Sequence, residues 1–448
     1  MARDGFTTSF GVIAATLGSA VGLGNIWKFP YLTGANGGAG FLLVYVLATL
    51  AVGLPVMISE IAIGRAARAD AVSAFARLAP PRQPWWLIGA MGVVAAVLIM
   101  AFYSAVAGWV FAYVLKSLAG GALSTDPKVT SAAFGALVAD PLQALAWQWL
   151  VLAFVGTIIL MGVAKGIEAV TKRLMPVLFL LLVLLGVRSL TLPGAGEGLA
   201  FLFRPEFSRI TPGVVLVAVG LAFFKLSIGM GTMVTYGSYF RADQNIPATA
   251  ARVMLADLAV SMLAGIAIFP AVFAFGFKPE AGPSLVFITV PAVFASMPAG
   301  ALFMTAFFVL TAVAATGAML SIVEVPVAVL SERMGLTRRA ATVITLVVIA
   351  LLGVLPALSQ GVAAQWKLGG MNAFDLCDSL SSNVLLPIGG ILVCVFTGWI
   401  WGRDRVAAEL SNRGALASGG VVRALRFLVR WVSPVLIVAV MLRGFGIA

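Results

Sequence analysis

The chain consists largely of long apolar stretches, most of them close to the ~20 residues that a helix needs to cross a lipid bilayer. We assign eleven such segments, at residues 9–34, 39–64, 86–116, 143–163, 169–190, 213–240, 248–277, 299–331, 338–356, 375–402 and 422–445. Only 10% of the 448 residues are charged, whereas soluble domains carry about 25%. The pattern therefore predicts an all-α polytopic membrane protein.

The distribution of basic residues predicts the topology. With the N-terminus in the cytoplasm, nineteen of the 29 Lys and Arg residues lie on the cytoplasmic side, eight lie outside, and Lys28 and Lys225 lie within helices. Because Lys and Arg collect on the cytoplasmic side, we attribute the net charge of +12 to topology and expect no nucleic-acid partner. We expect a multi-pass protein of the cell inner membrane, with its C-terminus outside. Without the last segment, ten helices and an inside C-terminus would result.

Two of the apolar segments are interrupted at matching positions. The first contains Gly18-Ser-Ala-Val-Gly-Leu-Gly-Asn25, and the sixth contains Ser227-Ile-Gly-Met-Gly-Thr232. Each glycine weakens a helix by about 1 kcal/mol relative to alanine, and a break within a bilayer survives only where it is buried or lines a cavity. Paired breaks in two halves of a chain point to a substrate site near the midplane, where free N–H groups bind an anionic group. The alternative is that the glycines only allow close helix packing.

The composition argues against catalysis. The absence of histidine excludes catalysis and proton shuttling by histidine. The intramembrane acids are too few and too scattered for an enzyme site; they are Glu60, Asp257, Glu324 and Asp378. We therefore expect no enzyme, no metal and no cofactor. The four longest connections, at 116–142, 190–212, 278–298 and 357–374, could cap the outer face or merely connect helices.

Specific motifs run through the whole chain. They are Gly18–Tyr31 (GSAVGLGNIWKFPY), Asn36–Phe41, Gly53–Pro55 with Glu60 and Gly64-Arg65, Ser227–Gly231, Thr235–Tyr239, Ile268–Ala271, Glu324–Pro326 and Asp375–Pro387. With them the chain resembles the neurotransmitter:sodium symporters, especially their bacterial amino-acid transporters. The resemblance implies the inverted-repeat leucine-transporter fold, with five helices, five inverted helices and one extra, and with helices 1 and 6 broken. It implies one transporter domain, 1–448, with repeats at about 9–190 and 213–402 and the extra helix at 422–445.

The resemblance also implies a binding site for an amino acid between the two breaks. The substrate carboxylate would contact the N–H groups of Leu23 and Gly24 and the hydroxyl of Tyr103. The implied substrate-binding residues are Ser19, Ala20, Leu23, Gly24, Ile99, Tyr103, Phe224, Lys225, Ser227, Met230, Ala318 and Ile322. Their largely apolar side chains predict a neutral, hydrophobic amino acid.

Two gates are implied as well. Lys28 and Asp378 would form an outer ion pair over the substrate, and Arg3 with Glu332 would form the inner gate. A lysine that merely extends to the membrane interface is the alternative for Lys28.

The first sodium site of the family is altered in this sequence. The site would use the carbonyl of Ala20 and the side chains of Asn25 and Asp257, but Lys225 stands at its hydroxyl position. Lysine offers three donors and no acceptor, and two cations about 4 Å apart repel each other by about 4 kcal/mol at an effective dielectric constant near 20. We infer that Lys225 replaces the ion and pairs with Asp257 and the substrate carboxylate; the alternative is that it extends to an aqueous vestibule.

The second sodium site lacks its hydroxyl groups. It would use the carbonyls of Gly18, Val21 and Ala314, but its two hydroxyl positions are Gly317 and Ala318. Thr316 is one residue early and therefore points about 100° away on a helix. Both sodium sites are thus degraded, by different changes.

A chloride requirement is not expected. Tyr45 and Ser261 match residues of chloride-dependent relatives, but the glutamine position is Leu221, and Asp257 already supplies a negative charge. We therefore predict an amino-acid transporter that works by alternating access, without sodium or with reduced sodium coupling. Proton coupling and uncoupled exchange stay open. The alternatives are a conventional sodium:amino-acid symporter and a non-transporting amino-acid sensor.

Overall fold

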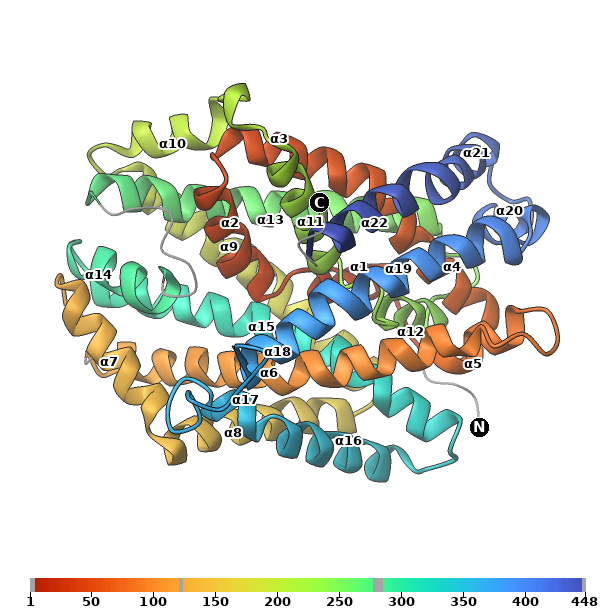
Figure 1. The fold of residues 1–448 in the computed structure, drawn as a ribbon, viewed down its shortest axis with the longest axis horizontal. Helices are drawn as coiled ribbons and strands as arrows, with labels where there is room; N and C mark the ends of the chain where they lie inside the picture. Colours follow the sequence, from red (N-terminus) through yellow and green to blue (C-terminus); the bar gives the residue numbers. More distant parts are fainter. Residues whose placement is uncertain (1–4, 121–123, 277–284, 445–448) are drawn as a thin grey trace.

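A computed structural model describes residues 5–120, 124–276 and 285–444, which are mostly helical (Figure 1). The first half comprises α1 (Ser9–Ala20), the π-helical turn η1 (Gly24–Lys28), α2 (Phe29–Ala35), α3 (Ala39–Ala48), η2 (Thr49–Gly53), α4 (Leu54–Ala67), α5 (Ala71–Leu78), α6 (Trp86–Leu118), α7 (Pro127–Ala139), α8 (Pro141–Leu160), η3 (Val163–Glu168), α9 (Ala169–Leu190) and α10 (Ala195–Phe203).

The second half continues the helical pattern and adds one small hairpin. It comprises η4 (Phe207–Arg209), α11 (Pro212–Lys225), α12 (Thr232–Ser238), α13 (Ile246–Ala274), η5 (Leu285–Thr289), α14 (Val290–Ala295), α15 (Gly300–Glu332), α16 (Arg338–Leu352), α17 (Val354–Leu358), β1 (Lys367–Leu368), β2 (Met371–Asn372), α18 (Ala373–Ser379), η6 (Leu380–Leu385), α19 (Leu386–Val395), η7 (Phe396–Ile400), α20 (Arg403–Leu410), α21 (Gly419–Phe427), η8 (Leu428–Val432) and α22 (Ser433–Gly444).

Among the described residues, nine segments are long and apolar enough to cross a membrane. Eight are continuous, and the ninth is the bent pair of α1 with η1–α2. The other two of the eleven predicted segments are the sixth, which is divided between α11 and α12, and the last, α21–η8–α22, which contains Arg423, Arg426 and Arg430. Each predicted segment thus corresponds to a helix or to a broken helix.

The two glycine-rich segments are breaks in the helices, as predicted. Helix α1 ends at Ala20 and the chain resumes as a helix at Gly24, with a bend of 52°. Between α11 and α12 the backbone has positive φ angles at Ser227 (52°), Gly229 (84°) and Gly231 (77°). A Cβ atom at Gly229 would lie 2.4 Å from the carbonyl oxygen of Leu386. Glycine is required there both for the backbone angle and for the close approach.

The long connections fold instead of only linking helices. Three of them contain α7, α10 and α14, and the fourth forms the β1–β2 hairpin around Gly369 and Gly370, both at positive φ. Phe134 of α7 stacks on Phe287 of η5 with ring centroids 4.9 Å apart, and Trp109 of α6 packs edge-on against both rings. These connections therefore cap one end of the helix bundle, at the left of Figure 1.

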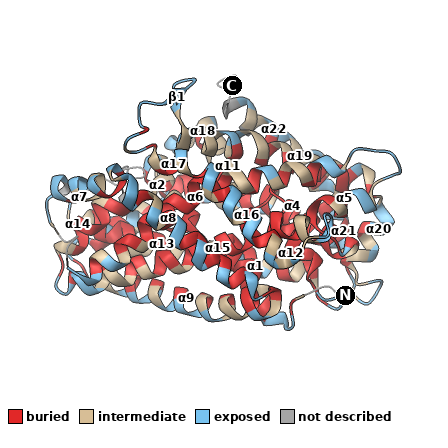
Figure 2. Ribbon diagram, turned by 90° about the horizontal axis from the view of Figure 1, so that it is seen from below, coloured by how far each residue is buried: buried red, intermediate tan, exposed pale blue. Residues whose placement is uncertain are grey.

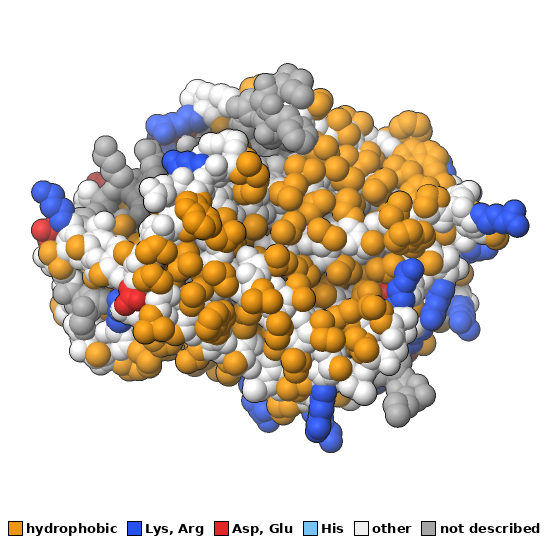
Figure 3. Space-filling model, turned by 60° about the horizontal axis from the view of Figure 1, so that its bottom comes forward, with side chains coloured by type: hydrophobic (Ala, Val, Ile, Leu, Met, Phe, Trp, Pro, Cys, Tyr) orange, Lys and Arg blue, Asp and Glu red, His pale blue; other side chains and the backbone are white. Residues whose placement is uncertain are grey.

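The surface is that of a membrane protein. Buried residues occupy the middle of the bundle, and exposed residues follow its rim and loops (Figure 2). In Figure 3 hydrophobic side chains cover the middle of the visible face, and several Lys and Arg side chains lie toward its right end, the end with α5 and α20 in Figure 1. We call this end of the molecule the α5 face.

Candidate functional site

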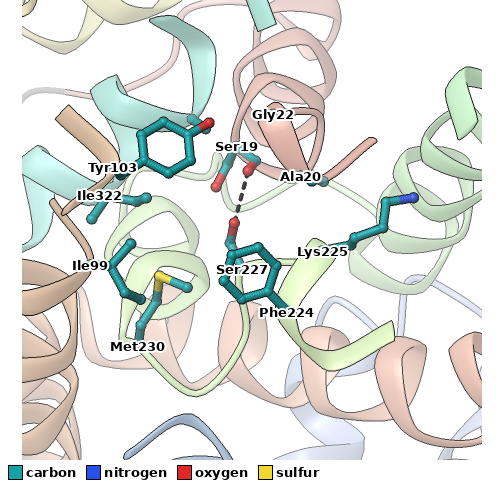
Figure 4. A pocket seen from close by; sticks show the side chains of 12 residues that line it. Ser19, Ala20, Gly22, Ile99, Tyr103, Phe224, Lys225, Ser227, Met230 and Ile322 are labelled. Carbon is teal, nitrogen blue, oxygen red and sulfur yellow. Dashed lines mark hydrogen bonds between the residues drawn. The ribbon is translucent and has the colours of Figure 1, made fainter. Parts of the chain in front are cut away.

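The two helix breaks face each other across a small cavity. The hydroxyl of Ser227, in the second break, donates a hydrogen bond of 2.8 Å to the carbonyl of Ser19, at the end of α1 (Figure 4). The cavity is lined by Ser19, Ala20, Gly22, Gly24, Ile99, Tyr103, Phe224, Lys225, Ser227, Met230, Ala318 and Ile322. Eleven of these residues are among the twelve implied from the sequence, so the structure brings that set together around one space.

The implied set differs from the observed lining in one residue: Leu23 was implied but does not line the cavity, whereas Gly22 lines it. Leu23 takes part through its backbone, because its N–H donates to the hydroxyl oxygen of Tyr103 at 3.0 Å. These are two of the groups that were assigned to the substrate carboxylate, and they bond each other here. Gly22 was missed as a lining residue. A Cβ atom on it would lie 2.9 Å from both the hydroxyl of Tyr103 and the Cβ of Ala318, so a larger residue would have to displace one of these groups.

The cavity is narrow and mostly apolar. Its volume is about 30 Å³, which is room for very few water molecules. Ser19 is 1% exposed, and its hydroxyl has no hydrogen-bond partner within the described part of the chain. A hydrophobic amino acid would enter only if lining side chains such as Phe224 and Met230 moved apart.

Lys225 ends helix α11 and directs its ammonium group away from Tyr103, out of the cavity (Figure 4). Its Nζ lies 3.1 Å from Oδ2 of Asp257, and neither side chain is exposed. It also donates to the hydroxyl of Tyr45 at 2.8 Å and to the hydroxyl of Ser261. The three donors of the ammonium group therefore have three oxygen partners. The predicted pairing with Asp257 is present, whereas contact with a substrate carboxylate stays a prediction.

Asn25 completes the polar cluster around this ammonium group. Its amide nitrogen donates to Oδ1 of Asp257 at 2.6 Å and to the hydroxyl of Ser261 at 3.2 Å. Its carboxamide oxygen accepts from the N–H of Gly22 at 3.2 Å. The oxygen atoms of Asn25, Asp257 and Ser261 are thus already hydrogen-bonded to protein donors. The sequence marked Tyr45 and Ser261 only as matches to a chloride site, and it did not indicate that both would contact Lys225.

The residues of the second sodium site lie where α1 crosses α15. A Cβ atom at Gly317 would lie 2.8 Å from the carbonyl oxygen of Gly18 and 3.2 Å from its Cα. Ala314 and Ala318 are buried in α15, and Val21 is buried directly after the end of α1. The two backbones therefore approach too closely for a hydroxyl side chain at residue 317 without a shift of a helix.

Thr316 does not replace the missing hydroxyl. Its hydroxyl donates to the carbonyl of Ala312, one turn earlier in α15, at 2.8 Å. Its side chain also borders an apolar groove whose wall includes Phe111, Trp147 and Leu174. The direction predicted from the helical spacing therefore agrees with the structure.

The outer-gate residues lie close together. Nζ of Lys28 is 3.8 Å from Oδ1 of Asp378, and it lies 4.1 Å from the ring centroid of Phe224. Arg3 of the inner gate lies outside the described residues, and Glu332 accepts a hydrogen bond from the N–H of Asp70 at 2.9 Å.

The two intramembrane glutamates differ in their contacts. Glu60 bonds a backbone group that the second break leaves free, accepting from the N–H of Gly229 at 2.6 Å. Glu324 pairs with side chains instead. Its carboxylate accepts from Arg338 at 2.7 Å and 3.0 Å and from the hydroxyl of Tyr239 at 2.7 Å. The start of α16 brings a guanidinium group to this carboxylate, which the linear sequence did not reveal.

Comparisons with known proteins give a consistent picture. Residues 3–124 and 139–446 match the model described as the sodium:neurotransmitter symporter family. The uncharacterized sodium-dependent transporter YhdH of Bacillus subtilis is 40% identical over 442 residues, which are 99% of this chain and 98% of that protein. An uncharacterized sodium-dependent transporter of Methanocaldococcus jannaschii is 30% identical, over 98% of this chain and 90% of that protein. A crystal structure of MhsT in complex with L-phenylalanine has a TM-score of 0.92 and 42% identity, and covers 99% of this chain and 100% of that one.

Proposed function

Because this chain belongs to the sodium:neurotransmitter symporter family, we propose that it carries a neutral, hydrophobic amino acid across the membrane by alternating access, without a requirement for sodium. It is a membrane transporter of the neurotransmitter:sodium symporter type. The choice of substrate and the sodium independence are the parts that we propose.

The lining of the cavity supports the proposed substrate. Ile99, Phe224, Met230 and Ile322 supply apolar surface, while the Leu23 N–H and the Tyr103 hydroxyl supply polar groups at one end. This division suits a molecule with a carboxylate and an apolar side chain. The MhsT complex contains L-phenylalanine, which has both. The residues that line the cavity include no carboxylate that would pair with a positively charged amino-acid side chain.

A single observation carries the proposed sodium independence: the ammonium group of Lys225 lies among Asp257, Tyr45 and Ser261, and the side chains of Lys225 and Asp257 are completely buried. A sodium ion in the same cluster would be repelled by the ammonium group and would need oxygens that already accept its hydrogen bonds. At the second site, the close approach of Gly317 to Gly18 also argues against a bound sodium ion.

A conventional sodium:amino-acid symporter is the second candidate. It is favoured by the names of the Bacillus subtilis and Methanocaldococcus jannaschii relatives, which describe sodium-dependent transporters. Such a protein would have to move Lys225 away from Asp257 before it bound the ion.

The remaining assignments are proposals as well. We infer that the α5 face is cytoplasmic and that the protein lies in the cell inner membrane, because α5 and α20 belong to the predicted cytoplasmic connections, which hold nineteen of the 29 Lys and Arg residues. The two inverted repeats would comprise residues of about 9–190 and 213–402. Lys28 with Asp378 would close the outer side, and Arg3 with Glu332 the inner side. Leu221 at the glutamine position argues against a chloride requirement.

The substrate can be identified by a thermal-shift screen of amino acids in detergent, in sodium chloride and in choline chloride. A ligand raises the stability with the logarithm of its concentration over its dissociation constant. We expect a hydrophobic amino acid to stabilise the protein equally in both salts. Uptake of that amino acid into proteoliposomes then tests transport itself. Stabilisation with no uptake would instead support a non-transporting sensor.

A further inference from the structure

Arg426, on α21 at the α5 face, is partly exposed, and one nitrogen of its guanidinium group is unsatisfied among the described residues. Its Nη1 atom is buried and has no hydrogen-bond partner among the described residues. A buried donor of a charged group costs free energy when it stays unpaired. Because Arg426 as a whole is partly exposed, an acceptor from outside the chain can approach its guanidinium group.

The charges around Arg426 define the nature of that acceptor. Arg403 and Arg430 act on Arg426 as like charges, and Asp404 acts as the opposite charge. Arg430 is fixed in place, because its Nε donates to the carbonyl of Gly398 at 2.7 Å and its guanidinium lies 5.5 Å from the ring centroid of Trp399. Three guanidinium groups and one carboxylate leave an excess of positive charge. Guanidinium groups bind phosphate well, because several N–H donors can meet its oxygens.

The surroundings of the arginine cluster (Arg403, Arg426 and Arg430) are those of a membrane interface. Trp399 and Trp431 pack edge to face with ring centroids 6.1 Å apart, and they are 43% and 62% exposed. Tryptophans of this kind are enriched at the level of the lipid headgroups. A free phosphate ion gains nothing from neighbouring tryptophans, so this position favours a lipid headgroup.

An apolar stripe continues from the cluster along the last helix. Trp431, Val435, Val438 and Leu442 follow one another at spacings of four, three and four residues, so they share one helix face, and all four are exposed. In Figure 1 α22 continues from α21 toward the middle of the molecule. The stripe therefore leads from the arginines into the hydrocarbon region.

We propose that Arg403, Arg426 and Arg430 bind the phosphate of an anionic phospholipid whose acyl chain lies along the stripe of α22. The charge excess selects an anionic headgroup over a zwitterionic one, and the stripe selects a lipid over a free anion. This site is separate from the amino-acid cavity and does not depend on the function proposed above.

Native mass spectrometry of the full chain in detergent, titrated with phosphatidylglycerol or phosphatidylcholine, tests the proposal. We expect phosphatidylglycerol to bind more tightly. One positive charge near an anionic lipid surface changes the binding affinity by about fivefold. Arg426→Gln and, at an exposed position, Arg403→Gln should each weaken phosphatidylglycerol binding by about that factor. Arg339→Gln removes the same charge from an exposed position at the start of α16 and should leave the affinity nearly unchanged.

Three results would overturn the proposal. Equal binding of both lipids would exclude selection by charge. An equal loss in Arg339→Gln and Arg403→Gln would mean that only the general surface charge matters. Displacement of the lipid by an excess of inorganic phosphate would identify a simple anion site. Because Arg403 is exposed, its variant keeps the test valid even if Arg426→Gln fails to fold.

Discussion

The ammonium nitrogen of Lys225 lies 3.1 Å from Oδ2 of Asp257, and both side chains are completely buried. The pair joins the end of α11, at the second helix break, to the middle of α13. Tyr45 and Ser261 complete the shell around the ammonium group. A fixed positive charge of the protein thus lies where the family resemblance implies a sodium ion.

Replacing Lys225 with serine should create a sodium-responsive protein. The change removes the ammonium group and supplies a hydroxyl oxygen near Asp257 and Asn25. Sodium that binds only the folded state would add about 2.7 kcal/mol of stability at 100 times its dissociation constant. The melting temperature of Lys225→Ser should therefore rise in sodium chloride relative to choline chloride. Lys28→Ser, at the partly exposed gate, is the matched control and should show no such difference.

The buried pair should tolerate joint removal better than removal of one partner. Asp257→Asn would leave a buried ammonium group without its counter-charge, and losing one partner of a buried ion pair costs about 3–5 kcal/mol. The double variant Lys225→Met/Asp257→Asn should therefore melt at a higher temperature than Asp257→Asn alone. Melting curves in detergent measure this, and additive losses would mean that the two side chains do not stabilise each other.

A hydroxyl restored at the second sodium site should not restore sodium binding. In Gly317→Ser the new Cβ would lie 2.8 Å from the carbonyl oxygen of Gly18, and overpacking of this kind costs about 1–3 kcal/mol. We expect a lower melting temperature and no response to sodium. Gly135→Ser is the control, because a Cβ atom there would have no neighbour within 4 Å. Sodium-dependent stabilisation of Gly317→Ser would show that the helices can separate.

The two residues of the outer gate should differ in importance. The Lys28–Asp378 pair is partly exposed, at 26% and 36%, and such a pair contributes about 0.2–1 kcal/mol. Lys28 also lies over the ring of Phe224 at 4.1 Å, a contact that contributes about 0.5–2 kcal/mol. Lys28→Gln should therefore raise the KM for uptake more than Asp378→Asn does. Equal effects would mean that the ion pair alone closes the gate.

The sequence predicted the leucine-transporter fold, and the structure confirms it. The glycines at residues 22, 24, 229 and 231 marked both breaks, because glycine weakens a helix wherever it stands. The helices in the connections, such as α7 and α14, were left open between capping and linking. They are short and partly apolar, and their packing, such as that of Phe134 on Phe287, depends on residues far apart in the chain.

The candidate site was predictable where a single residue changes the chemistry. Lys225 stood out because an intramembrane lysine needs a partner. The family resemblance placed Asp257 at the same ion site, which made it the expected partner. The roles of Tyr45 and Ser261 as partners of Lys225, and of Arg338 as a partner of Glu324, depend on contacts between distant segments. Spacing along the chain carries no signal for such contacts.

The central claim is tested most directly by the initial rate of amino-acid uptake into proteoliposomes, measured with sodium on both sides and with sodium replaced by choline on both sides. Because Lys225 supplies a positive charge at the first ion site that the resemblance implies, and because Gly317 and Gly18 approach closely at the second, we predict equal rates in the two salts. Uptake that is abolished in choline would contradict the account.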